Sequence, residues 1–341
     1  MCNIVFISFK TIFEGYTPNE ISSTFKTFQD NRLIVSKRVA AANPYWQTLP
    51  ASQKFTPDGY ARGYGRYSQD VLVPAFLAAY AGTDPNTAPL IKQSNAKVSS
   101  NPFAGIIPRP NWRLTYTGLT KIPAIAEKFN NISFSHSYKG NLSMNSFNSA
   151  LLYQDPFRLG GPSFMDTVSG NYIPFFLVPN ITMQENFEPL IGLDFTTNKQ
   201  MNMHFEYRKG RQLSLSLVDY QLSESRSTEW VFGFSFRTQG LNLPFTIPGM
   251  KNAKLVNDLT VKVDLSMRDI SNSNSRLDQT NAYGTGGQKE ITIQPSIDYV
   301  LNSRVNLQFF FDQRRVQPYI STAAPSTTTR AGVKVRVSLA Q

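Results

Sequence analysis

The chain has 341 residues, of which 41% are hydrophobic, 13% aromatic and only 17% charged, and its formal net charge is +11. Soluble domains usually carry about 25% charged residues, so this balance does not favour an ordinary cytosolic enzyme. Cys2 is the only cysteine, which excludes a disulfide within the chain and a cysteine-based metal cluster. The basic residues are scattered, with no run longer than Arg314-Arg315, and we therefore expect no nucleic-acid partner.

The first third of the chain differs from the rest. We expect residues 1–13 to form one strand and residues 14–105 to form a helical, loop-rich insertion. Within this insertion, residues 20–42 and about 69–82 are predicted helices, the second starting at Ser68 or Asp70 with Pro74 in its first turn. The insertion is predicted to cap a β-structure or to fill its lumen. An ordinary core helix of a small domain explains residues 69–82 equally well.

Residues 106–341 are predicted to be strands, because apolar and polar residues alternate there. In the clearest run, 131–145, residues such as Ile132, Phe134 and Tyr138 share one face, while Ser133, Lys139 and their neighbours share the other. The same alternation recurs at 201–208, 212–217, 229–237, 259–268, 304–312 and 333–339.

The length of these runs indicates a membrane. A tilted strand needs about 9–11 residues to cross a bilayer, whereas strands of soluble sheets are usually nearer 5–6 residues. No stretch approaches the roughly 18 apolar residues of a membrane-spanning helix. We therefore predict an all-β fold with a minor helical insertion, namely an antiparallel transmembrane β-barrel.

Connections between the runs fit this fold in part. We predict eleven or twelve strands, with short inner turns at 209–211 and 300–303 and long outer loops at 270–288 and 316–328. The Pro-rich stretch 239–256 is long on the inner side and breaks the rule.

The polar side chains of the runs are candidates for the wall of an aqueous lumen. Alternation places them opposite the apolar stripes. The candidate lumen-facing residues are Lys139, His204, Glu206, Arg208, Lys262, Asp264, Arg268 and Arg336.

No recognisable active site is present in the sequence. The two histidines, His136 on the apolar face and His204 on the polar face, stand in no nucleophile motif and make a poor metal site. Gly63-Tyr64-Gly65 and Gly286-Gly287 match no nucleotide-binding turn and are expected to be loop glycines. Asp194, Asp264 and Asp312 lie on different strands without a calcium-loop pattern. We therefore expect no enzyme, no catalytic residue, no metal and no cofactor.

Several collinear segments resemble the giant outer-membrane translocon of the type IX secretion system, the SprA/Sov family. They include Pro110–Leu119, Ser135–Tyr138, Ile181–Asp194, Glu206–Lys209, Leu213–Leu222, Asp298–Leu301, Pro318–Thr322 and Ser338–Gln341. The resemblance covers most of the chain and is tightest from about 106 to 341. It carries over no catalytic motif. It marks as structural family positions Pro110, Asn111, Trp112, Tyr116, Gly118, Phe187, Pro189, Leu190, Gly192 and Asp194.

This resemblance implies a function in protein export. Family members are far longer, so the chain is expected to be the C-terminal arc of a very large barrel, with the export signal upstream. Its place would be the outer membrane, at the cell surface, of a Bacteroidetes-type bacterium, where the translocon exports folded cargo and supports gliding motility. The implied partners are cargo proteins with C-terminal sorting domains, a partner outer-membrane barrel, a plug protein and outer-membrane lipid.

Two other functions stay open from the sequence. A smaller porin or transporter barrel would require these strands to close on themselves. A secreted β-rich adhesin would require an exposed aromatic groove, whereas Trp230, Phe232, Phe234 and Phe236 form a continuous stripe on one face.

Overall fold

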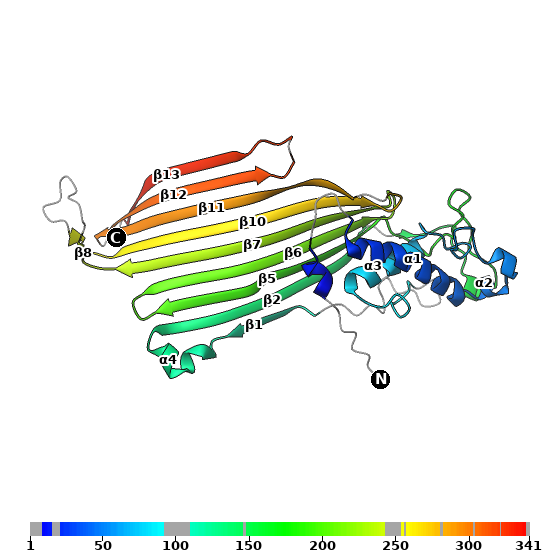
Figure 1. The fold of residues 1–341 in the computed structure, drawn as a ribbon, viewed down its shortest axis with the longest axis horizontal. Coiled ribbons are helices and arrows are strands. Elements are labelled where there is room, and N and C mark those ends of the chain that lie inside the picture. The colour runs from blue at the N-terminus through cyan, green and yellow to red at the C-terminus, as the bar shows by residue number, and fades with distance from the viewer. Residues whose placement is uncertain are drawn as a thin grey trace.

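The structure, a computed structural model, consists of one long antiparallel sheet with a group of helices at one end (Figure 1). The described residues are 9–15, 21–91, 110–145, 148–242, 254–255, 257–279, 282–302, 304–320 and 322–338. The antiparallel β architecture with a minor helical part agrees with the prediction from sequence.

Nine strands of the described chain form the main sheet, and each pairs with the strands that neighbour it along the chain. They are β1 (Trp112–Tyr116), β2 (Phe129–Asn145), β5 (Asn180–Thr197), β6 (Met201–Ser216), β7 (Gln221–Thr238), β10 (Leu259–Arg276), β11 (Ala282–Asn302), β12 (Val305–Pro318) and β13 (Ser326–Val337). Two short ladders lie beside it, β3 (Asn148–Ser149) with β4 (Phe176–Leu177) and β8 (Leu241–Asn242) with β9 (Lys254–Leu255). In the order of the sheet, β1 and β13 are the two edges.

The strands of the main sheet are longer than predicted, and the described chain contributes nine of them where eleven or twelve were expected. The expected turn at 209–211 is wrong, because β6 runs without a break from Met201 to Ser216. The expected loops 270–288 and 316–328 are largely strand as well, because β10 continues to Arg276, β11 begins at Ala282, β12 continues to Pro318 and β13 begins at Ser326. Lys209 and Arg211 lie on the same face of β6 as Met203 and Leu213, because residues two apart along a strand share a face. The charged residues therefore mark a different environment along one strand and not a turn.

The helices of the described chain gather mainly in its first third. They are η1 (Phe9–Phe13), α1 (Ser23–Ala42), α2 (Pro44–Thr48), η2 (Ala51–Gln53), α3 (Gln69–Ala81), η3 (Gly118–Lys121), α4 (Pro123–Ala126) and α5 (Pro156–Leu159). The helices predicted at 20–42 and 69–82 are thus confirmed as α1 and α3. Ser22 caps α1 by accepting a hydrogen bond from the Phe25 backbone N–H, and Ser68 is the N-cap residue of α3. Pro74 lies in the second turn of α3, not the first.

The strand predicted at 1–13 is wrong for the part that the structure describes. Residues 9–13 form the 3-10 helix η1, and residues 1–8 lie outside the described chain. Ile12 is buried against Tyr138 and Phe187, and the Thr11 hydroxyl donates to the Tyr80 carbonyl oxygen at 3.1 Å. These tertiary contacts, which no local pattern announces, favour a short helix over a strand.

The helical unit, which we define as α1, α2, α3 and their connections through Ile91, has its own core. Phe25, Phe28 and Val39 of α1 are fully buried, as are nearly all side chains of α3. The Phe28 and Phe76 rings meet edge to face with their centroids 5.8 Å apart.

The connection between β2 and β5 folds onto the helical unit, so residues 106–341 are not all strands of one sheet as predicted. Gly63 forms a parallel bridge with Asn171, and its carbonyl oxygen accepts a hydrogen bond from the Tyr172 N–H at 2.8 Å. Gly63 has φ +82°, and a Cβ there would overlap the Tyr172 ring. This close approach requires glycine.

Candidate functional site

The register of the sheet sorts its side chains onto two faces of opposite character. On one face, which we call the apolar face, nonpolar side chains from all nine strands meet in a continuous band. The band comprises Leu114, Tyr116, Ile132, Phe134, Ile191, Leu193, Phe195, Met201, Met203, Phe205, Tyr207, Trp230, Phe232, Phe234, Phe236, Leu259, Val261, Val263, Leu265, Met267, Ile291, Ile293, Ile297, Tyr299, Val305, Leu307, Phe309, Phe311, Val333, Val335 and Val337.

The band is long enough to cross a bilayer. In β10 it covers the nine residues from Leu259 to Met267, and a tilted strand needs about 9–11 residues to cross. Many of its large side chains are not covered by other parts of the described chain: Phe232 is 41%, Phe309 46% and Val335 60% exposed.

One edge of the band is a line shared by neighbouring strands. Tyr207 and Trp230 stack on this line with their centroids 4.2 Å apart. The next register row on the same face is polar and runs Lys209–Thr228–Asp269–Lys289–Gln317 across β6, β7, β10, β11 and β12. The apolar stripe therefore ends at this line on β6, β7, β10 and β11, although these strands continue. On β12 it already ends at Phe311, because Gln313 and Arg315 stand opposite Ile293 and Ile291.

The opposite face, which we call the polar face, is hydrophilic along its length. By register it carries all eight of the residues predicted to face a lumen, Lys139, His204, Glu206, Arg208, Lys262, Asp264, Arg268 and Arg336. Its few apolar members include Val231 and Phe310, and the Lys334 ammonium lies 4.7 Å from the centroid of the Phe310 ring.

Ion pairs between strands connect the charges of the polar face. Arg208 pairs with Glu206 and lies 3.4 Å from Glu229 on β7. Arg314 binds Glu290 through two nitrogens at 2.6 and 2.7 Å. These pairs are partly solvated, so each contributes at most about 1 kcal/mol. The face is a wetted, mixed-charge surface and not a concentrated binding site.

His204 is the one side chain of the polar face whose neighbours suggest catalysis, and its geometry does not fit. Its Nδ1 lies 2.6 Å from the Asp194 carboxylate, which is the pairing seen in hydrolase triads. A nucleophile would have to stand at Nε2, but that nitrogen faces the Glu206 carboxylate at 3.4 Å. The nearby Ser133 hydroxyl donates to Asp194 and not to the imidazole. His136, on the other face, has its Nδ1 2.7 Å from the Leu190 carbonyl oxygen.

The positions singled out by resemblance fall at one corner of the sheet, where β1, β2 and the irregular middle of β5 meet. The Trp112 ring stacks on Tyr138 at 4.7 Å, and Phe187 packs on the other side of Tyr138 at 5.1 Å. The pairing of β5 with β6 shifts between Phe187 and Ile191, a stretch that includes the cis Glu188-Pro189 bond.

The other family positions support the same corner. The Asn111 side-chain oxygen accepts the Gly140 N–H at 2.7 Å. A Cβ on Gly192 would overlap Ser135 and Pro189, and a Cβ on Gly118 would meet the Tyr116 hydroxyl. Leu190 packs against the buried cluster of Ile12, Tyr138 and Phe187, and Pro110 precedes β1. Their role is to hold this corner together.

A buried ion pair lies beyond the band, beneath η1. The side chains of Arg211 and Glu185 are 1% and 2% exposed and pair with each other on the apolar face. The Tyr138 hydroxyl donates to Glu185 at 3.1 Å, and Arg211 donates to the Thr11 hydroxyl at 3.0 Å. This pair connects η1, β2, β5 and β6.

The helical unit is attached to the apolar face. Its core includes Ile181 and Met183 of β5, Leu213 and Leu215 of β6, and Leu222 of β7. By register all five belong to the face that carries the band, on the far side of the polar row. We expected this segment to cap the β-structure or to lie in its lumen. The packing does not fit a position on the polar face, and it agrees with an attachment at the strand ends.

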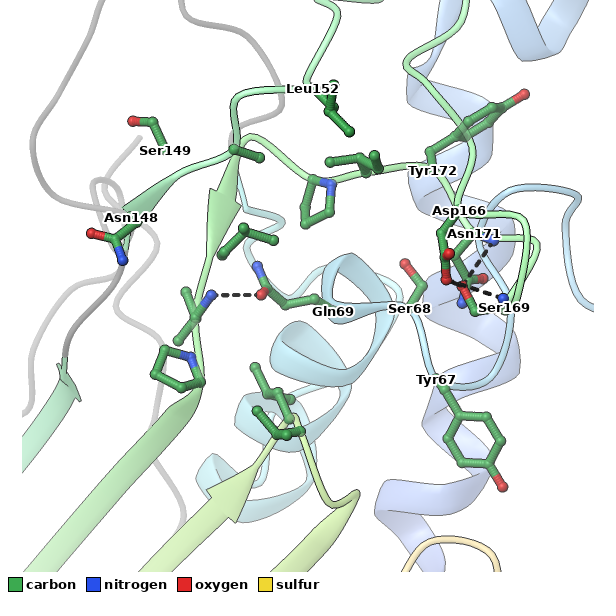
Figure 2. Close-up of a pocket in the computed structure, with 18 of the residues that line it drawn as sticks. Tyr67, Ser68, Gln69, Asn148, Ser149, Leu152, Asp166, Ser169, Asn171 and Tyr172 are labelled. Atoms are coloured by element: carbon green, nitrogen blue, oxygen red, sulfur yellow. Dashed lines mark hydrogen bonds between the residues drawn. The ribbon is translucent and has the colours of Figure 1, made fainter.

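A hollow of about 910 Å³ lies where the helical unit meets the β2–β5 connection and the turn after β6 (Figure 2). Three of its polar side chains are already hydrogen-bonded within the chain. The Gln69 side chain donates to the Phe176 carbonyl oxygen and accepts from the Val178 N–H at 2.8 Å, while Asp166 accepts from Ser169 and Asn171 from Gly65. The hollow is a packing gap between the helical unit and the sheet with its β2–β5 connection. Its polar side chains do not converge on a common point where a ligand could bind.

Asp70, in the first turn of α3, gives the helical unit a pH dependence. Burial of its carboxyl raises its pKa from 3.8 to about 7. The folded chain then binds a proton more tightly than the unfolded chain, so stability falls as the pH rises from about 4 to 7 and stays low above 7. Three pKa units correspond to about 4 kcal/mol.

We therefore expect Asp70→Asn to stabilise the helical unit at pH 8 and to leave it nearly unchanged at pH 4. The measurement is proteinase K cleavage within α1 and α3 of the full chain, followed against urea concentration at each pH. Asp84→Asn, at an exposed carboxyl whose pKa is lowered by hydrogen bonds with Asn86, is the control and should give no gain at pH 8. Equal effects of Asp70→Asn at both pH values would contradict the assignment.

Metal sites and membrane-spanning helices were sought over the same part of the chain. Within the described residues, no three His, Cys, Asp or Glu side chains are grouped so that they could hold a metal ion. Among the helices described, none is both long enough and apolar enough to cross a membrane.

Comparison with known proteins adds no assignment. No protein-family model matches the chain, and no curated protein matches it.

Proposed function

We propose that the chain forms part of the wall of an outer-membrane β-barrel, and that this barrel is a protein-conducting channel of type IX secretion. In this proposal the apolar face contacts lipid and the polar face contacts the aqueous lumen. The channel exports folded cargo with C-terminal sorting domains to the cell surface and supports gliding motility.

The observation that carries the proposal is the band on the apolar face. It extends over nine strands, is as long in β10 as a tilted membrane-crossing strand requires, and is bounded on one side by an aromatic pair and a polar row. In water, a surface of this size with Phe309 and Val335 half exposed would be an aggregation-prone patch. In lipid it is the stable arrangement.

The edges of the sheet favour an arc of a larger barrel over a small closed one. Unpaired backbone N–H and C=O groups each cost several kcal/mol in lipid, so strands beyond β1 and β13 are needed. Direct closure would pair β1 with β13, but β1 has 5 residues and β13 has 12. A strand as short as β1 leaves most of such an edge unpaired.

The export activity rests on the polar face and on the resemblance to the SprA/Sov family. A wide lumen for folded proteins needs a wall that is wetted and binds nothing tightly. The scattered, mutually compensated charges of the polar face, such as Arg208 with Glu206 and Arg314 with Glu290, meet that need. An adhesin would instead present an aromatic groove, and the aromatic stripes here form a flat band.

The test is made in the bacterium that carries the gene. We expect deletion of the sequence encoding β10–β13 to leave proteins with C-terminal sorting domains inside the cell and to stop gliding. The measurements are the cargo content of the medium and the spreading of colonies. Normal secretion by such cells would overturn the export function, and recovery of the intact chain from the soluble fraction would overturn the membrane assignment.

The polar face yields a separate prediction. We expect the triple charge reversal Lys262→Glu/Arg268→Glu/Arg336→Glu to leave assembly intact, because solvated surface changes of this kind usually alter stability by about 0.5 kcal/mol or less each. It should shift the ion selectivity of the assembled channel toward cations, as measured by reversal potentials in planar bilayers. An unchanged selectivity with normal assembly would place these residues outside the lumen.

A further inference from the structure

Basic side chains stand at one boundary of the band, on the apolar face. Lys289 of β11 lies in the first polar register row, and Arg315 of β12 lies opposite Ile291, the last apolar residue of β11. Diagonal neighbours on one face of an antiparallel pair are about 7–8 Å apart, so the two cations are spaced to share one anion. Lys209 on β6 extends the row beside the helical unit, where its ammonium lies 5.2 Å from the centroid of the Phe13 ring.

The cations at this boundary have fewer carboxylate partners than the other cations of the sheet. On the polar face, Arg314 and Arg330 pair with Glu290 and Asp312. Lys289 and Arg315 form no ion pair with any described residue, although Asp269 stands opposite Lys289 in the register. Two further arginines at this height, Arg211 and Arg226, are neutralised by Glu185 and Glu224.

Hydrogen-bonding groups surround the two free cations. Gln317 pairs with Lys289 in the register, and Thr327 pairs with Arg315. Arg315, Gln317 and Thr327 are exposed. Cations, amides and hydroxyls at one height are the groups that bind a phosphate oxygen.

We propose that Lys289 and Arg315 bind the phosphate of an anionic membrane lipid and so fix the depth of the barrel wall in the bilayer. The site rests on the proposed function, because it requires the band to lie in lipid. The row is then at headgroup level, where each Lys or Arg near an anionic surface strengthens binding about fivefold. The stacked Tyr207 and Trp230 lie at the same boundary, where aromatic side chains are enriched.

The test compares lipid retention by the full chain and by two double variants, each extracted in detergent from membranes of the bacterium that carries the gene. Lys289→Gln/Arg315→Gln removes the site, and Lys262→Gln/Arg268→Gln removes the same charge from the polar face. The probes are phosphatidylglycerol, phosphatidylcholine and inorganic phosphate, and bound lipid is counted by native mass spectrometry.

We expect the unmodified chain and the polar-face variant to prefer phosphatidylglycerol over phosphatidylcholine, and the site variant to bind phosphatidylglycerol roughly 25-fold more weakly, from two factors of about five. Millimolar inorganic phosphate should not displace the lipid. Equal phosphatidylglycerol binding by both variants, or full displacement by phosphate, would overturn the site.

The two proposals can fail separately. Heat-modifiable migration in gels reports membrane assembly without reference to the lipid site. An assembled chain without lipid preference removes the site alone, whereas a chain that is recovered unassembled in every sample removes the membrane assignment and the site with it.

Discussion

Replacement of Leu265 by arginine should prevent the chain from assembling in the membrane, while the same change at the next residue, Ser266, should be tolerated. Leu265 lies inside the band, one register row from its edge at Met267, opposite Phe232 and Ile293, and Ser266 points to the other face of the same strand. An arginine on the lipid face of a barrel costs about 2–4 kcal/mol at the bilayer midplane and less toward the interfaces, whereas one in an aqueous lumen costs little. The two variants share charge, strand and depth, so the difference between them reports which face meets lipid.

The measurement is the fraction of chain that resists urea extraction from the outer membrane and migrates as a heat-modifiable form. We expect a fall of at least tenfold for Leu265→Arg and less than twofold for Ser266→Arg. In a soluble sheet the result would reverse, because arginine at Leu265 would improve solubility. Equal loss from both variants would indicate that both faces are buried, and would contradict the assignment of a lumen.

The two faces of the sheet could be predicted from sequence because alternation is a strictly local property. Once Phe232 and Phe234 are known to share a face with Trp230, every other side chain of β7 is placed. The lumen candidates at His204, Arg208 and Lys262 followed in the same way, and the register puts them on one face.

The length of the strands was harder to predict. Lys209-Gly210-Arg211 looks like a turn when composition alone is read, because two charges flank a glycine. The unbroken alternation could have indicated a continuous strand, because Tyr207, Lys209, Arg211 and Leu213 are each two residues apart and so share one face. The residues are polar because this part of β6 lies beyond the band and under η1.

The attachment of the helical unit could not be predicted. α3 is buried on almost every side, from Asp70 to Tyr80, so it has no polar face that would indicate which neighbour it packs against. Its partners Ile181 and Leu213 are separated from it by more than a hundred residues. The fold of the β2–β5 connection had a weak signal in the cluster Gly160-Gly161-Pro162 and Gly170, which interrupts the strands.

The second large effect is expected at the buried ion pair. Replacing Arg211 by methionine leaves the Glu185 carboxylate in a site that is 2% exposed, with the Tyr138 hydroxyl as a donor at 3.1 Å. Removing one partner of a buried pair costs about 3–5 kcal/mol, because the other charge stays buried without compensation. Since Arg211 also donates to Thr11, the loss should appear first as release of η1 from the sheet.

The double variant Arg211→Met/Glu185→Leu separates the loss of the pair from the loss of a large side chain. It removes both charges and should recover most of the stability, because apolar replacements of a buried pair are often neutral or stabilising. Arg208→Met is the matched control, since its ion pair with Glu206 lies on the polar face with the arginine 40% exposed, and it should cost no more than about 1 kcal/mol. Urea midpoints for protease cleavage at η1 provide the measurement. If Arg211→Met and Arg208→Met lower the midpoint equally, the pair beneath η1 is solvated, and the helical unit is held to the apolar face by its hydrophobic contacts alone.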